Sequence, residues 1–104
     1  MLEQLRALTT GFTHRFPEGN NPFQIMTRLL EEGGELAQMV NHFEGTGIKT
    51  QKYGEPDKAK LAKEVKDALL CVLQVADHYD IWPEVESTLQ QSYEHLKAEG
   101  HIPA

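Results

Sequence analysis

The longest helical pattern in this chain lies between residues 57 and 80, and it limits what the rest can fold into. Apolar residues recur there at spacings of three and four: Leu61, Val65, Ala68, Leu69, Val72, Val75, Ala76 and Tyr79. This spacing gathers side chains on one side of an α-helix. Because the apolar positions cover a broad part of the circumference, we expect a central helix with neighbours on more than one side.

Three other segments show helical periodicity, and the two segments between them and the long pattern lack it. Four helices are expected, over about residues 2–10, 22–43, 57–80 and 83–99. The intervening segments 11–22 and 45–55 are rich in Gly, Pro, Asn or polar residues and read as loops. No alternating stretch is long enough for a strand. The expected fold class is therefore all-α, a four-helix bundle in a single domain over residues 1–104.

The amino-acid composition of the chain limits the classes of partner and the cellular compartment that we expect for it. A net charge of −6 argues against nucleic acid, which needs a basic surface, but suits a site that collects divalent cations. No apolar run is long enough for a membrane span, and no signal peptide is visible at the N-terminus. Cys71 is the only cysteine, so no intrachain disulfide can form. We expect a cytoplasmic protein with no membrane or nucleic-acid partner.

Acidic residues border the apolar stripes of the second and third helices. Glu32 and Glu35 lie on one flank of the second helix, and Glu64 and Asp67 on one flank of the third. Residues three apart on a helix share a face and can reach a common point. Glu31 points further round the second helix.

The two pairs also match in height. If the second and third helices form an antiparallel hairpin with its turn between Phe43 and Pro56, Glu35 and Glu64 are each eight residues from these ends, and Glu32 and Asp67 are each eleven. Both pairs then lie at about 12–16 Å from the turn. Four facing carboxylates would repel one another unless a cation lay between them, and all-oxygen ligands suit Mg²⁺ or Mn²⁺. The alternative is that these are ordinary solvated helix faces.

Two glycines, Gly33 and Gly34, interrupt this acidic turn. Each glycine inside a helix lowers helix stability by about 0.8–1 kcal/mol relative to alanine. We therefore expect a structural or functional reason for these two glycines. Without Cβ atoms they would let a ligand or another helix approach the backbone. Tight helix packing without chemistry explains them equally well.

The acidic motifs resemble a known family signature. "EEGGE" (31–35) followed by "EVKD" (64–67) is similar to the EExxE … ExxD pattern of the MazG-like, all-α nucleoside triphosphate pyrophosphohydrolases. The resemblance covers about residues 20–80. It implies Mg²⁺-dependent cleavage of a nucleotide between its α- and β-phosphates, giving a monophosphate and pyrophosphate. It also implies self-association as a dimer or tetramer.

Residue roles follow from this resemblance position by position. Glu32, Glu35, Glu64 and Asp67 match the family's metal ligands. Glu31 matches the first acid of the motif, and its different angular position suits orientation or deprotonation of the attacking water. The last helix departs from the family pattern, because "SYEHLKAEG" (92–100) holds one basic residue, which leaves substrate choice open.

Several other residues are candidates for substrate contact. Lys49, Lys52, Lys60 and Lys63 are placed to contact phosphates, although exposed lysines are most often only solvated. Phe16 is a candidate for stacking on a base, whereas Phe23 is expected in the core.

Two other functions fit the same sequence. A phosphoribosyl-ATP pyrophosphatase of histidine biosynthesis shares the acidic helices of this superfamily. A non-catalytic helical interaction module, with purely structural acids, is the alternative outside enzymology. The complete set of five acids favours an enzyme.

Overall fold

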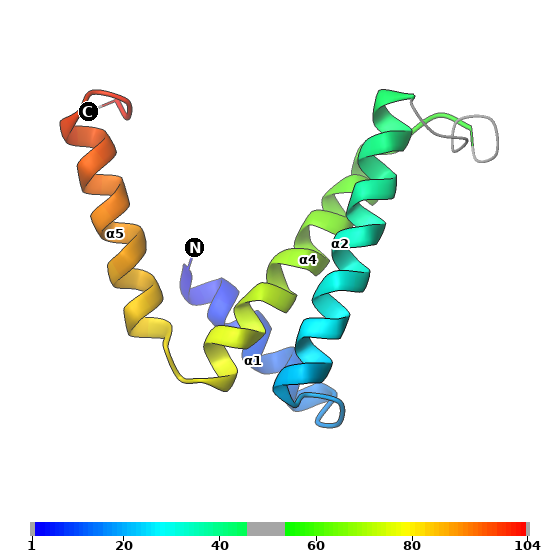
Figure 1. Cartoon of the computed structure of the whole chain (residues 1–104), viewed down its shortest axis with the longest axis horizontal. Helices are drawn as coiled ribbons and strands as arrows, with labels where there is room; N and C mark the ends of the chain where they lie inside the picture. The colour runs from blue at the N-terminus through cyan, green and yellow to red at the C-terminus, as the bar shows by residue number, and fades with distance from the viewer. Residues whose placement is uncertain (1, 46–53, 104) are drawn as a thin grey trace.

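Four helices make up most of the chain in the computed structural model, which describes residues 2–45 and 54–103 (Figure 1). They are α1 (Leu2–Arg15), α2 (Pro22–Glu44), α4 (Lys58–His78) and α5 (Trp82–Ala98). These ranges contain no strand, so the all-α prediction is confirmed. None of these four helices is both long enough and apolar enough to cross a membrane.

The ends of α2 and α4 are set by local sequence. Asn21 accepts a hydrogen bond from the Gln24 backbone N–H at 2.9 Å, and the Gln24 side chain accepts one from the Asn21 N–H at 3.2 Å. This reciprocal pair is a capping box, with Pro22 in the first turn. At the other end, Gly45 has φ 69°, the left-handed conformation that glycine adopts at low cost. Asp57 caps α4 through the Ala59 N–H at 2.8 Å.

Helix α1 is longer than predicted. The expected loop over 11–22 was wrong in its first part, because the helix continues through Gly11 to Arg15. Thr9 is fully buried, and its hydroxyl donates to the Leu5 carbonyl at 2.7 Å. Thr10 donates to Asp77 of α4 at 3.2 Å. Packing of α1 on α4 therefore outweighs the weak helix propensity of this segment.

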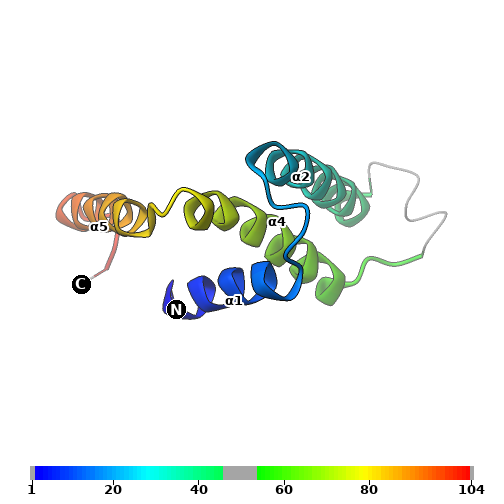
Figure 2. The ribbon, with the colours of Figure 1, turned by 90° about the horizontal axis from the view of Figure 1, so that it is seen from below.

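Helix α4 is central, as its broad apolar face predicts. It runs antiparallel to α2 along most of its length (Figure 1), and Figure 2 shows it between α2 and α1. A small core forms where α1, α4 and α5 meet. It consists of Leu70, Leu73, Ala76 and Trp82, with Leu2, Leu5 and Val85 packed against it. The Trp82 N–H donates to Asp77 at 3.2 Å.

Beyond its first turn, helix α5 stands apart from the other three. It contacts α4 only near their junction, and the two arms of the molecule open as a V (Figure 1). A single chain therefore does not close the expected four-helix bundle. Its radius of gyration is 16.8 Å, whereas a compact chain of this length would have about 13 Å.

Large apolar side chains remain exposed along the helices. Phe23, expected in the core, is 83% exposed at the start of α2, so that expectation was wrong. On α2 the exposed residues Met26, Leu30 and Val40 follow helical spacing, and Val65, Leu69 and Val72 do so on α4. We call these six residues the hairpin face.

Candidate metal centre

Three of the four predicted ligands come together between α2 and α4. Glu32, Glu35 and Glu64 each offer one carboxylate oxygen, and these atoms all lie within 4.8 Å of one another. The antiparallel hairpin produces this meeting, because it brings the acidic turn of α2 to the same height as that of α4. The predicted cluster is thus present for these three residues.

Two oxygens in this cluster lack a partner. Oε2 of Glu32 and Oε2 of Glu64 are buried and accept no hydrogen bond within the described chain. A buried carboxylate oxygen without a donor is costly, so such atoms indicate a missing partner. A hard divalent cation would supply it, because carboxylate oxygens are the ligands it prefers. The donor set therefore fits Mg²⁺ or Mn²⁺.

The position of Glu32 in this cluster changes the pKa of its carboxyl group. Burial raises the pKa of its carboxyl group above 4.5, and the negative charges of Glu35, Asp67 and Glu64 raise it further. Lys63 acts in the opposite direction. Glu32 thus holds its proton more strongly than a free glutamate, which is expected where like charges gather without a cation.

Asp67, the fourth predicted ligand, is engaged elsewhere. Its carboxylate forms ion pairs with Lys63 at 2.7 Å and with Lys66 at 3.2 Å. Burial acts to raise the pKa of Asp67, but hydrogen bonds from these two lysines outweigh it and lower the pKa below its usual value. Asp67 is close enough to Glu32 to affect its pKa, yet it is not among the three converging carboxylates.

Glu31 lies one helical turn before Glu35, about 40° from it and about 100° from Glu32 around α2. It is exposed and lines a hollow with Gln24, Thr27 and Arg28, which none of the three converging carboxylates lines.

The predicted lysines differ in position. Lys60 is exposed and lines a hollow that includes Glu35 and Glu64. Lys63 is paired with Asp67. Lys49 and Lys52, with most of the 45–55 segment, lie outside the described residues.

On the side of the centre toward the hairpin turn is the Lys60 hollow, of about 400 Å³. Four carboxylates and one lysine line it, so its charge suits phosphates only with a bound cation. Its lining residues are Glu35, Gln38, Met39, His42, Glu55, Asp57, Lys60 and Glu64. His42 is buried, and its Nε2 is 2.7 Å from the Gly54 carbonyl oxygen, which ties the end of α2 to the segment before α4. Sequence reasoning gave His42 no role, because it completes no recognisable motif.

On the other side of the centre is a second hollow, of about 290 Å³, which we call the Phe16 hollow. Its lining residues are Phe12, Phe16, Asn20, Arg28, Glu32, Asp67, Leu70, Cys71 and Gln74. Sequence reasoning missed Arg28 and Gln74. The available signal was that Arg28 precedes Glu32 by four residues and so shares its helix flank.

Cys71, the single cysteine, is buried in the wall of this hollow. Burial raises the pKa of its thiol, which the nearby Arg28 charge partly opposes. A thiol with a raised pKa is a poor nucleophile, in keeping with a packing role.

The two glycines are open to space within one chain. A Cβ built on Gly33 or Gly34 would meet no atom within 4 Å. Tight packing against another helix of the same chain is therefore not their explanation.

Comparison with known proteins adds one relative. The chain is 36% identical over 81 residues to the uncharacterized protein YpjD of Bacillus subtilis (strain 168). The match covers 77% of this chain and 70% of YpjD. No family model matches the chain, and no solved structure matches it significantly.

Proposed function

We propose that this chain, which belongs to the same protein family as YpjD of Bacillus subtilis, is a divalent-cation-dependent nucleotide pyrophosphohydrolase. It would cleave a ribo- or deoxyribonucleoside triphosphate between the α- and β-phosphates to give a monophosphate and pyrophosphate. One observation carries the proposal: Glu32, Glu35 and Glu64 converge with two buried oxygens that lack partners. These residues stand in the EExxE … ExxD frame of the MazG-like enzymes.

Mg²⁺, or Mn²⁺ in its place, would be held by Glu32, Glu35 and Glu64, with Asp67 as the fourth ligand. When bound, the cation neutralises charge on the phosphate oxygens, which is the main requirement of phosphoryl chemistry. Asp67 now faces Lys63 and Lys66. Its turn toward a cation would release Lys63, a positive charge beside the phosphates.

Glu31 is the residue we assign to the water. Its exposed carboxylate lies one helical turn before Glu35 on the same flank of α2, farther from Glu32 than Glu35 is. In the reaction, the water oxygen bonds to the α-phosphorus while the bond from that phosphorus to the bridging oxygen breaks. The bridging oxygen leaves with pyrophosphate, and Glu31 accepts the proton that the water loses. A general base of this kind contributes about 10²–10⁴ in rate.

Lysines supply further positive charge for the phosphates. Lys60 stands in the Lys60 hollow beside two of the acids, with its side chain exposed. Lys49 and Lys52 remain proposed phosphate contacts from the part of the chain outside the described residues.

The test is pyrophosphate release from a panel of canonical and modified nucleotides, including phosphoribosyl-ATP. We expect release with Mg²⁺ or Mn²⁺ and none with a chelator. Asp67→Asn should abolish the cation-dependent activity while circular dichroism shows unchanged helicity. Release of orthophosphate in place of pyrophosphate, turnover without a cation, or full turnover by Asp67→Asn would each contradict the proposal.

We also propose that two or more copies associate, most simply as a dimer. The chain exposes 7835 Å², whereas a compact monomer of 11.8 kDa would expose about 5900 Å². The excess, about 1900 Å² per chain, is in the range that permanent homodimers bury. Much of the exposed surface is apolar, including the hairpin face and the outer part of α5.

A further inference from the structure

The candidate metal centre stands between two hollows of different chemistry. Glu35 and Glu64 belong to the Lys60 hollow, and Glu32 and Asp67 belong to the Phe16 hollow. The carboxylates thus form the boundary between the two. A ligand bound across the centre would place one end in each hollow, so the residues of the hollows indicate its direction.

Aromatic and amide groups distinguish the Phe16 hollow. Phe12 and Phe16, at the end of α1, keep 37% and 56% of their surface exposed. The amides of Asn20 and Gln74 lie in the same wall, over the buried Leu70 and Cys71. A flat ring with hydrogen-bonding edges fits such a wall, because its faces stack on phenylalanine and its edge meets an amide. A nucleobase has this chemistry.

Arg28 sets the orientation of both amides. Its Nη2 donates to Oε1 of Gln74 at 2.8 Å and to Oδ1 of Asn20 at 3.2 Å. Its Nη1 donates to the Gly19 carbonyl at 3.2 Å. Because a guanidinium only donates, each amide must turn its oxygen toward Arg28. This leaves the NH₂ groups to face other partners.

Each NH₂ group has one internal bond. Nδ2 of Asn20 donates to the Phe16 carbonyl at 2.7 Å, and Nε2 of Gln74 donates to the Thr13 hydroxyl at 3.5 Å. Since an amide nitrogen carries two hydrogens, each group retains one N–H for a ligand. Arg28 is therefore a positioning residue that presents two donors at the Phe16 hollow.

We infer that the Phe16 hollow binds the base of the nucleotide and that the β- and γ-phosphates extend toward Lys60. The inference rests on the proposed function and adds to it the direction of the substrate and the residues that select its base. The α-phosphate then lies over Glu32, Glu35 and Glu64. Phe16 supplies stacking, which every base accepts, whereas Gln74 supplies an edge contact, which differs between bases.

The first experiment separates the base from the phosphates. Binding of α,β-methylene nucleoside triphosphates and of inorganic tripolyphosphate is measured by calorimetry with Mg²⁺. Because loss of base stacking costs about 1–3 kcal/mol, Phe16→Ala should weaken nucleotide binding about 5- to 150-fold and leave tripolyphosphate binding unchanged. Phe16→Trp should restore nucleotide affinity. Lys60→Ala should weaken both ligands alike.

The second experiment tests base selection. Gln74→Leu should change the ratio of affinities among the ATP, GTP, CTP and UTP analogues, whereas Phe16→Leu should weaken all four similarly. Gln90→Leu, the same substitution at an exposed site on α5, should change neither. Circular dichroism and urea unfolding of each variant confirm that the fold is kept.

The outcomes distinguish this inference from the function it rests on. If Phe16→Ala weakens tripolyphosphate as much as the nucleotide, or leaves nucleotide binding unchanged, the base assignment is wrong while pyrophosphate release still supports the proposed function. If the wild-type protein binds neither ligand with Mg²⁺ and releases no pyrophosphate, the proposed function fails and the base assignment fails with it.

Discussion

Among single residues, Glu32 has the most direct consequence for stability. Its pKa is raised by burial and then by its acidic neighbours, so the folded chain binds its proton more tightly than the unfolded chain does. The unfolding free energy of the cation-free protein should therefore fall as pH rises from 4.5 through the pKa of the folded state. Glu32→Gln removes this fall and should be more stable than the wild type at pH 7 without Mg²⁺.

Urea unfolding of both proteins between pH 4 and 7, in chelator, measures this difference. Asp67 acts with the opposite sign, because its lowered pKa stabilises the fold above 3.8. The part of that contribution that comes from Lys63 and Lys66 is common to both proteins and cancels in their difference. Added Mg²⁺ should reverse the order, stabilising the wild type more than Glu32→Gln. A constant difference across this pH range would contradict the electrostatic account of Glu32.

Glu31 and Glu35 provide a matched comparison of roles. Glu35 is one of the converging carboxylates, whereas Glu31, one turn before it on α2, is not. We expect Glu31→Gln to lose turnover by about 10²–10⁴ and keep its Mg²⁺ affinity, and Glu35→Gln to lose both. Calorimetric Mg²⁺ titration and pyrophosphate release of the two variants measure the contrast. Equal loss of Mg²⁺ affinity would make Glu31 a ligand.

The sequence predicted part of the site at this scale. Glu32, Glu35 and Glu64 could be placed together because helical spacing and hairpin height are simple functions of residue number. The roles of Arg28 and Gln74 could not be predicted, because the loop after α1 brings Gly19 and Asn20 to Arg28, and Arg28 in turn bonds Gln74 across the two helices. The spacing of apolar residues does not predict the path of the loop between α1 and α2.

At the scale of helices, ends with strong local signals were predictable and ends fixed by packing were not. The capping box of Asn21 and the left-handed Gly45 mark α2 within the sequence itself. The extension of α1 past Gly11 depends on burial of Thr9 and on Asp77, residues far apart in the chain. The separation of α5 was also unpredicted, because its apolar stripe resembles that of a helix packed in its own chain.

The exposed glycines of α2 give a prediction for this helix. Alanine at Gly33 or Gly34 would meet no atom within 4 Å in a single chain. Each substitution should therefore stabilise the helix by up to about 0.8–1 kcal/mol, raising the urea midpoint. Sedimentation of the same variants supplies the control. Lower stability together with weaker self-association would show that a second copy approaches this backbone.

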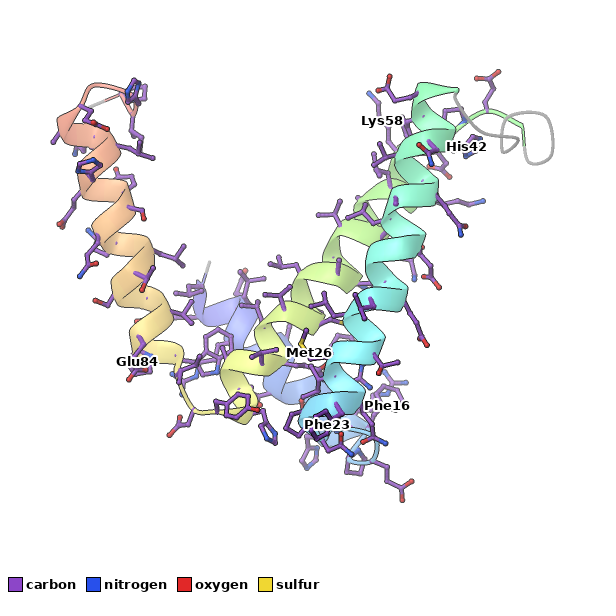
Figure 3. The ribbon with its side chains drawn as sticks, in the orientation of Figure 1. Phe16, Phe23, Met26, His42, Lys58 and Glu84 are labelled. Carbon is purple, nitrogen blue, oxygen red and sulfur yellow. The ribbon has the colours of Figure 1, made fainter. Side chains whose placement is uncertain are left out.

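For the whole molecule, the hairpin face and Glu35 lie on opposite sides of α2. At about 100° per residue, Met26, Leu30 and Val40 are about 140–180° from Glu35, whereas Glu32 lies between these two faces. Figure 3 shows the labelled Met26 on α2, beside α4. An apolar surface of two adjacent helices can pack against its own copy as a four-helix arrangement. The bundle that one chain leaves open would then be completed by two.

Leu30→Glu tests this assembly. Leu30 is 74% exposed in the single chain, so the substitution should not unfold it. A charge buried between two copies would be costly. We therefore expect a species of twice 11.8 kDa for the wild type and of 11.8 kDa for the variant at micromolar concentration.

The control is Leu8→Glu, at an exposed position on α1 outside the hairpin face, which should remain associated. Because Leu30 is about 140–160° from Glu35 and Glu32 around α2, Leu30→Glu should still bind Mg²⁺. A wild-type protein that sediments as a single chain would contradict this assembly.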